Sequence, residues 1–189
     1  PEQFKVAVFY SISNCQPGLR NVSLGNFLIK RVAEHLKREL PQLKTFCTLS
    51  PIPGLMAWLQ RVEVNALGEA AQALVLLRER CGGDLGVLAH AASGPALDGP
   101  AHHALWRLAA HYLVHVSPLP HGDPVARFHL DNGARLERLN ASANESAKGL
   151  KQSAGLMVNY LYDLGKIEKH HDHFAHGKVA HSRAVSALL

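Results

Sequence analysis

The sequence predicts a mixed α/β fold, and three observations lead to that prediction. Residues 5–12 and 45–49 are short runs rich in β-branched and aromatic side chains, as in buried strands. Between them, residues 24–40 place apolar side chains at every third or fourth position, the spacing of an amphipathic helix. Such a strand–helix–strand unit normally pairs its strands in parallel through a right-handed crossover. Helical patterns then fill residues 54–117, and strand-like patterns return nearer the C-terminus.

Turn and cap residues delimit the first helix. The loop of residues 13–23 contains Asn, Pro and Gly, which favour turns. Ser23 is expected to cap the helix, because a serine hydroxyl accepts a hydrogen bond from the first helical turn. Pro41 cannot continue a helix, so we expect the helix to end near residue 40.

The middle of the chain is predicted to be a helical insertion at about residues 54–117. Its clearest helices are residues 64–80 and 100–116, and the stretch that separates them, residues 82–99, contains Gly and Pro. A shorter helix is expected at residues 123–130, where Asp123 can cap the helix and a proline follows at the first helical position.

Two strands and a histidine-rich segment complete the pattern. Residues 134–140 alternate apolar and polar side chains like an edge strand, and residues 156–164 give another strand. Residues 170–176 are expected to form a solvated or flexible turn before a last helix from about residue 178. The histidines of this segment do not have the spacing of a known metal site, so we predict no metal there. They are His170, His171, His173 and His176.

Composition excludes several classes of protein. The chain has 189 residues, of which 47% are hydrophobic and 19% charged, so it can form a packed core. It has no apolar run of the roughly 18 to 20 residues that a membrane span requires. Three separated cysteines argue against a disulfide scaffold or a zinc–thiolate site. The sequence shows no leader, so we expect a reducing cytoplasmic location, or a mitochondrial or peroxisomal one in a eukaryote.

The net charge of +5 favours anionic partners without identifying them. Basic residues occupy one face of the first helix, but two glutamates interrupt them and no aromatic side chains lie among them. We therefore interpret this face as solvated and predict no nucleic-acid interface. The basic residues are Lys30, Arg31, Lys37 and Arg38.

Two loops could carry chemistry. Residues 20–26 join the first strand to its helix, where free backbone N–H groups and the helix dipole can hold a pyrophosphate. An ordinary crossover loop is the simpler interpretation of these residues alone. Residues 49–54 follow the second strand, and their two prolines would fix the direction of the Ser50 hydroxyl. Ser50 lacks the G-x-S-x-G surroundings of a serine hydrolase, and a rigid strand exit explains the segment equally well. His129, taken alone, fits a packed or solvated histidine.

Several segments taken together are much more specific. They are FYSISNCQPGLRNVSLGNFLIKRV, TLSPIPG, HGDPVARFHLDNGARLERLN and GLMVNYLYDL, in this order. This series closely resembles the C-terminal catalytic region of malonyl-CoA decarboxylases over nearly the whole chain, most loosely in the helical insertion. The resemblance implies one catalytic domain over residues 1–189, with a partial GNAT-like acyl-CoA fold.

The resemblance also implies the site and the reaction. Ser50 and His129 correspond to a catalytic pair, and Tyr162 to a tyrosine near the acyl end. The CoA-phosphate loop would be Arg20, Asn21, Val22, Ser23, Leu24, Gly25 and Asn26. The reaction would convert malonyl-CoA to acetyl-CoA and CO2 with no cofactor. The family has an N-terminal helical domain and further GNAT strands upstream of this region, and it suggests a homo-oligomer.

Two alternatives remain open at this point. The chain could be a non-catalytic CoA-binding remnant or a fragment of the same family, which its departures from the family pattern would suit. It could also be an acyltransferase on the GNAT fold, although no feature specifies an acceptor substrate. The departures are Asn21, Ser23, Ala141 and Asn144.

Overall fold

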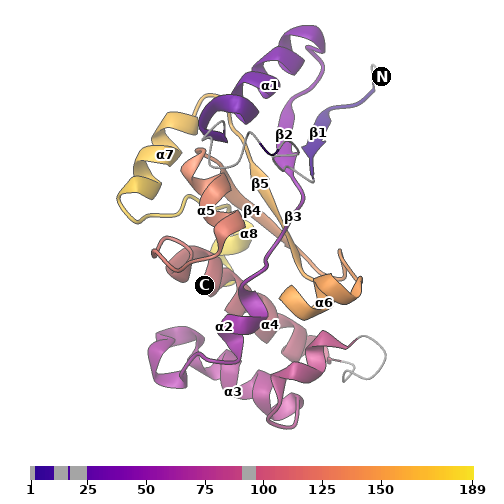
Figure 1. Ribbon diagram of the computed structural model, residues 1–189, viewed down its shortest axis with the longest axis vertical. Helices are drawn as coiled ribbons and strands as arrows, with labels where there is room; N and C mark the ends of the chain where they lie inside the picture. The colour runs from indigo at the N-terminus through magenta and orange to yellow at the C-terminus, as the bar shows by residue number, and fades with distance from the viewer. Residues whose placement is uncertain (1–2, 11–16, 18–24, 91–96) are drawn as a thin grey trace.

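The structure is a computed structural model that describes residues 3–10, 17, 25–90 and 97–189. A mixed sheet forms one part of the molecule, and helices gather at one end of it (Figure 1). The mixed α/β prediction is confirmed. The strands are β1 (Val6–Phe9), β2 (Thr45–Thr48), β3 (Ser50–Pro51), β4 (Arg135–Asn140) and β5 (Met157–Leu161).

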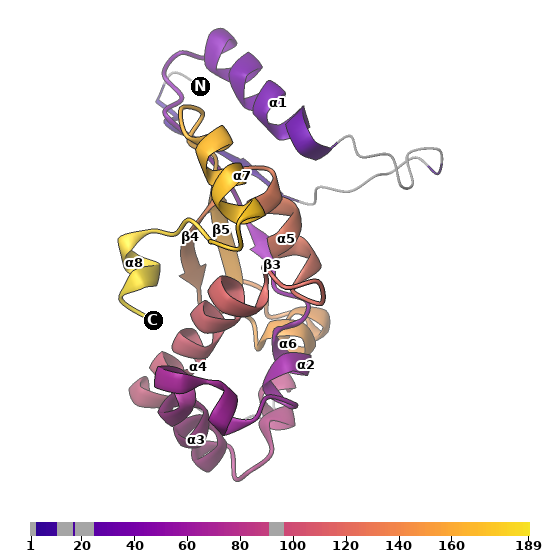
Figure 2. The same ribbon diagram turned by 90° about the vertical axis from the view of Figure 1, so that its left-hand side faces the viewer.

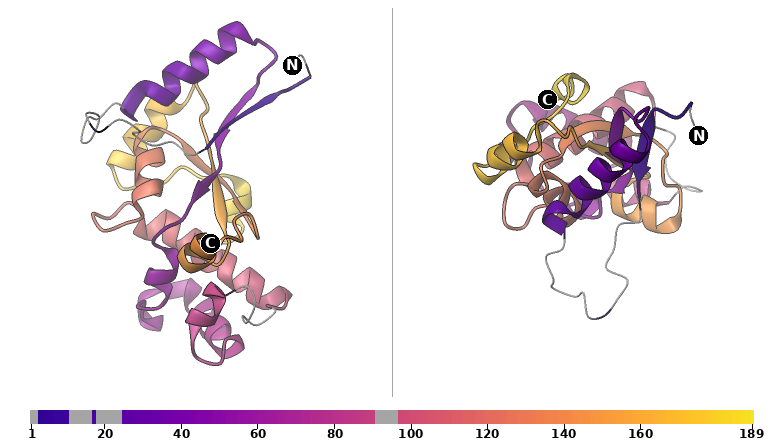
Figure 3. Two further views of the ribbon diagram at one scale, coloured as in Figure 1. Left: turned by 45° about the vertical axis from the view of Figure 1, so that its right-hand side comes forward. Right: turned by 90° about the horizontal axis from the view of Figure 1, so that it is seen from above.

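The first unit has the predicted connectivity. Strand β1 leads into helix α1 (Gly25–Glu39), and β2 then pairs with β1 in parallel, with Val6 opposite Thr45. The helix buries Ile29 and Ala33, which lie four residues apart on its inner face. Helix α1 thereby covers the β1–β2 end of the sheet on one side (Figure 3).

Strand β5 holds the rest of the sheet together through antiparallel pairing. It pairs with β4 on one side and with both β2 and β3 on the other. Cys47 lies opposite Leu161 and Ser50 opposite Val158, so β2 and β3 keep one register across Leu49. The Leu49 amide instead donates to the Phe9 carbonyl of β1.

Helices α1, α5 and α7 lie on one side of the sheet, and α2, α3 and α4 lie together beyond one end of it (Figures 1 and 2). The bounds are α2 (Leu55–Leu59), α3 (Ala71–Arg80), α4 (Gly99–His111), α5 (Pro124–Asp131), α6 (Ala147–Ser153), α7 (Ile167–Ala175) and α8 (Arg183–Ser186). Short 3-10 turns lie at Val64–Ala66, Gly68–Ala70 and Leu85–Ala89, and a π-helical turn lies at Tyr112–Val116.

The predicted helix over residues 64–80 is divided. Gly68 has a positive φ of 51°, which a continuous α-helix does not allow, so two 3-10 turns precede α3. The predicted helix over residues 100–116 changes after His111 to the π-helical turn. The predicted helix over residues 123–130 is present as α5, with Asp123 as its cap.

The histidine-rich segment was predicted wrongly as a turn. It forms most of helix α7, because Ile167 and His170 share a buried face that packs toward α5. The His170 ring nitrogen Nδ1 lies 3.3 Å from the Gly133 carbonyl oxygen. The last helix starts at Arg183, later than predicted, since residues 178–182 run in extended form beside β4.

One sheet face at β1 is open to solvent in the part of the chain that the structure describes. Phe4, Val6, Val8 and Tyr10 alternate along the strand and are 48–73% exposed, whereas Ala7 and Phe9 face the core. Among the described residues, none of the helices has the length and apolar character needed to cross a membrane.

Candidate active site

Ser50 lies where the second strand stops following the regular ladder. It is 4% exposed and begins β3, opposite Val158 of β5. Just before it, side chains replace backbone ladder bonds: the Tyr160 amide donates to Thr48 Oγ1 (3.3 Å), and Asn159 Nδ2 donates to the Thr48 carbonyl (2.6 Å). The Ser50 hydroxyl donates to the same Thr48 Oγ1 at 2.9 Å. The serine is therefore fixed by its own strand.

Helix α5 carries His129 to this position. Asp123 Oδ1 accepts the amides of Val125 and Ala126, each at 3.0 Å, and Pro124 occupies the first turn. These features start the helix at a defined residue, and His129 lies in its last turn. The ring is buried, with 3% exposure.

Three hydrogen bonds join the buried side chains into one chain. His129 Nε2 lies 3.0 Å from Ser50 Oγ, and His129 Nδ1 lies 2.8 Å from the Tyr162 hydroxyl. Since the single Ser50 hydrogen is donated to Thr48, Nε2–H donates to Ser50 and Nδ1 accepts from Tyr162. Tyr162 thus donates to His129, His129 donates to Ser50, and Ser50 donates to Thr48.

Tyr160 fixes the plane of the imidazole. Its ring stacks on the His129 ring, with centroids 4.6 Å apart and an interplanar angle of 26°. The residue is fully buried, and its hydroxyl has no hydrogen-bond partner among the described residues. The stacking leaves both ring nitrogens of His129 at the ring edge, free to bond to Ser50 and Tyr162.

The surroundings keep these groups neutral. Burial lowers the pKa of His129 to about 3, so the imidazole is uncharged at neutral pH. Burial also raises the pKa of Tyr162 well above its usual value, so its hydroxyl is protonated in the resting site. A neutral imidazole with one N–H and one lone pair can donate a proton at one nitrogen while it accepts one at the other.

The structure brings together three of the residues expected from sequence: Ser50, His129 and Tyr162. Gly25 and Asn26 form the start of α1, in agreement with a helix N-terminus at that loop. Arg20, Asn21, Val22, Ser23 and Leu24 lie outside the described residues, so the CoA-loop prediction stays a prediction.

Sequence analysis missed two residues of the site, Thr48 and Tyr160. Thr48 lies two residues before Ser50, and Tyr160 lies two before Tyr162. Side chains two apart on a strand point to the same face, so this spacing was a usable signal. Within residues 3–10, 25–90 and 97–189, no group of three or more His, Cys, Asp or Glu is arranged to hold a metal ion.

Residues 1–189 match the malonyl-CoA decarboxylase C-terminal domain. This chain belongs to the malonyl-CoA decarboxylase family. A mitochondrial malonyl-CoA decarboxylase of Mus musculus is 42% identical over 178 residues, which cover 84% of this chain and 35% of the relative. The mitochondrial malonyl-CoA decarboxylase of Anser anser anser is 36% identical over 184 residues and is likewise covered to 35%. The chain thus spans about a third of the length of these curated relatives.

Solved malonyl-CoA decarboxylases have the same fold. The crystal structure from Cupriavidus metallidurans superposes with a TM-score of 0.82 at 45% identity, covering 98% of this chain and 48% of that one. The structure from Agrobacterium vitis gives a TM-score of 0.77 at 46% identity, covering 99% of this chain and 46% of that one. The resemblance noted in the sequence is confirmed.

Proposed function

We propose that this chain catalyses the decarboxylation of malonyl-CoA to acetyl-CoA and CO2. The observation that supports this most is the buried Tyr162–His129–Ser50 hydrogen-bond chain in a member of this family. The arrangement offers a neutral proton donor and a fixed hydroxyl in a site that excludes water.

The reaction makes simple demands on such a site. When the bond between C2 and the carboxylate breaks, its electron pair moves into the thioester as an enolate. The carboxylate must be held out of the carbonyl plane, and C2 must then receive a proton. Since the thioester itself accepts the electron pair, we propose that no cofactor takes part.

Each side chain has a role in this scheme. When substrate binds, the Ser50 hydroxyl turns its hydrogen from Thr48 to the malonyl carboxylate and orients it. After CO2 leaves, His129 Nε2–H donates its proton to C2, and the Tyr162 hydroxyl replaces that proton at Nδ1, so the ring stays neutral. When the product leaves, solvent protonates Nε2 and Nδ1 returns its proton to Tyr162, which restores the starting tautomer. The enolate carbon is a stronger base than the tyrosinate formed in this step, so an uncharged donor suffices.

The direct test is turnover of malonyl-CoA by Ser50→Ala and His129→Asn. We expect kcat to fall by about 10²- to 10⁴-fold in His129→Asn, the usual contribution of a general acid, with little change in CoA binding. His176→Asn is the matched control, because that histidine lies on the surface of the molecule. Turnover by His129→Asn at the rate of His176→Asn would contradict the assigned role.

The resemblance also supports proposals about the whole assembly. We propose a homo-oligomer that acts with an upstream helical domain in the longer polypeptide, and that binds neither nucleic acid nor membranes. We propose a cytoplasmic location, or a mitochondrial or peroxisomal one in a eukaryote. Light scattering coupled to size-exclusion chromatography would report the oligomeric state, and a monomer at micromolar concentration would contradict it.

A further inference from the structure

The carboxylate of Asp123 connects the two segments that supply the proposed catalytic pair. Its Oδ1 accepts the amides of Val125 and Ala126 at the start of the helix that carries His129. Its Oδ2 accepts the Gly54 amide at 3.0 Å, at the end of the loop that carries Ser50. Asp123 is 1% exposed, and within the described part of the chain every hydrogen-bond donor to its carboxylate is a backbone N–H.

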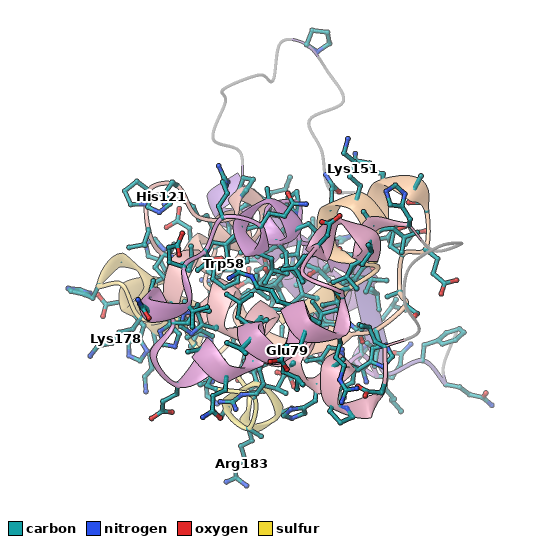
Figure 4. The ribbon with its side chains drawn as sticks, turned by 90° about the horizontal axis from the view of Figure 1, so that it is seen from below. Trp58, Glu79, His121, Lys151, Lys178 and Arg183 are labelled. Carbon is teal, nitrogen blue, oxygen red and sulfur yellow. The ribbon has the colours of Figure 1, made fainter. Side chains whose placement is uncertain are left out.

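The contact between loop and carboxylate depends on a glycine. A Cβ atom at Gly54 would overlap the Tyr112 hydroxyl and would lie 3.3 Å from Asp123 Oδ2. Tyr112 is held in place by Trp58, whose ring centroid is 5.0 Å away and which lies near the middle of the view from below in Figure 4. Any larger residue at position 54 would therefore push the loop off the carboxylate.

The arrangement is unlike an ordinary helix cap. At Asp98, the N-cap of α4, the carboxylate accepts the Ala101 amide of its own helix, and its second oxygen pairs with the Arg80 guanidinium in an exposed ion pair. At Asp123 the second oxygen instead accepts a hydrogen bond from the Gly54 amide, which belongs to another segment inside the protein. Burial raises the pKa of Asp123, and the three backbone amides oppose that shift by stabilising its charged form.

We propose that Asp123 is a positioning residue that sets the hydrogen bond between Ser50 and His129. One carboxylate ties the segment that follows Ser50 to the start of the His129 helix, and so helps to hold the two side chains at their 3.0 Å separation. Its effect on turnover rests on the proposed decarboxylase function, but its effect on the Ser50–His129 bond does not.

The Asp123→Asn variant separates the two tasks of the carboxylate. The amide oxygen can still cap α5, because asparagine is as good an N-cap as aspartate. The amide NH2 would then face the Gly54 amide, so that two donors meet and the loop is released. Asp98→Asn is the matched control, since it makes the same change at a cap that binds backbone only in its own helix and otherwise forms an exposed ion pair with Arg80.

The measurement is the NMR signal of the His129 ring in long-range 1H–15N spectra of the 15N-labelled 189-residue chain. The signal is assigned to His129 because it disappears in His129→Asn. In Asp123→Asn we expect the Nε2–H proton to move upfield and to exchange with solvent at least about tenfold faster, as when a buried hydrogen bond is lost. In Asp98→Asn it should stay in place. We also expect kcat to fall by about 10²-fold, the usual cost of a small misplacement, with KM little changed.

A second pair of variants covers the case in which Asp123→Asn does not fold. Gly54→Ala leaves the cap intact and displaces the loop, so it should reproduce the upfield shift and the faster exchange of the Nε2–H proton. Tyr112→Phe removes the hydroxyl that the new Cβ would meet, so Gly54→Ala with Tyr112→Phe should restore the wild-type shift and exchange rate.

Two results would overturn the inference. One is a folded Asp123→Asn variant in which the His129 Nε2–H proton keeps its wild-type shift and exchange rate. The other is an equal change of shift and exchange rate in Asp98→Asn. If the unmodified chain does not decarboxylate malonyl-CoA, the proposed function fails while the NMR comparison still decides the role of Asp123.

Discussion

At the scale of the residue, burial rather than a partner charge determines the state of His129. Among the residues that the structure describes, no carboxylate lies against either ring nitrogen, whereas a serine and a tyrosine do. In many catalytic histidines a carboxylate stabilises the imidazolium, as in the Ser-His-Asp triad. Here the low pKa, about 3, suits a ring that passes a proton on without holding a charge.

Thr48 allows the polarity of the hydrogen-bond chain to be tested. Thr48→Val keeps the shape but removes the acceptor for both Ser50 and the Tyr160 amide. Leaving buried donors unpaired should lower the free energy of unfolding by about 1–3 kcal/mol. The Ser50 hydrogen should then turn toward His129 Nε2, which reverses the tautomer and lowers kcat. Urea denaturation and turnover measurements would check both effects.

Thr48→Ser provides the comparison, because it keeps the hydroxyl and loses only a methyl group. It should show much the smaller loss of both stability and turnover. Equal effects of the valine and serine variants would show that the hydroxyl does not orient Ser50.

The sequence predicted the members of the site better than their connections. Ser50, His129 and Tyr162 were identified because the segments that carry them, taken together, resemble malonyl-CoA decarboxylases. The roles of Thr48 and Tyr160 depend on strand pairing between residues more than 100 positions apart, which local patterns do not encode. The second bond of Asp123, to Gly54, is equally non-local, although its role as a cap was predictable from the following proline.

At the scale of the element, helix α5 is fixed at both ends. Asp123 starts it, and Gly133 ends it with a φ of 76°, after which the chain enters β4. Gly133 also touches the backbone of Ile167 at the start of α7. The position of His129 therefore depends on turns at both ends of the helix that carries it.

Gly133→Ala tests how much that turn contributes. Alanine at a positive φ costs about 1–2 kcal/mol, and its Cβ would overlap the Ile167 carbonyl, which adds about 1–3 kcal/mol. Gly177→Ala is the matched control, because Gly177 has the same φ of 76° and no atom within 4 Å of the new Cβ. Thermal or urea unfolding should show the larger loss at Gly133, and equal losses would exclude the contact with α7 as its cause.

Elements with strong local signals were predicted well, and elements made by tertiary contacts were not. The β1–α1–β2 unit and α5 follow from hydrophobic spacing and caps. Strand β3 has two residues and exists only because β5 pairs with it. Helix α7 was missed because its histidines suggested a polar turn, whereas the buried stripe of Ile167 and His170 stabilises a helix.

At the scale of the whole molecule, buried neutral histidines make stability depend on pH. Burial lowers the pKa of His129, and also that of His111 and His170. Below the ordinary value of 6.5, the unfolded chain binds a proton at His129 that the folded chain does not. Stability contributed by this group is therefore full above about pH 6.5 and falls as the pH drops toward 3.

We expect the free energy of unfolding to fall by about 1.4 kcal/mol per pH unit for His129 alone in this window. Asp123 acts in the opposite direction as it takes up a proton, because its pKa is raised. Urea denaturation between pH 7.5 and pH 4.5, roughly the range where this slope develops, would measure the effect. His129→Gln should flatten the slope by about one proton, and an unchanged slope would contradict a buried neutral His129.

We propose that the Tyr162–His129–Ser50 hydrogen-bond chain serves the decarboxylation of malonyl-CoA by delivering a proton to carbon. Mass spectrometry of the product formed in D2O would test this step. We expect acetyl-CoA with one deuterium in its methyl group and release of CO2, both lost in His129→Asn. Release of free CoA and malonate, or the same deuterated product from His129→Asn, would contradict it.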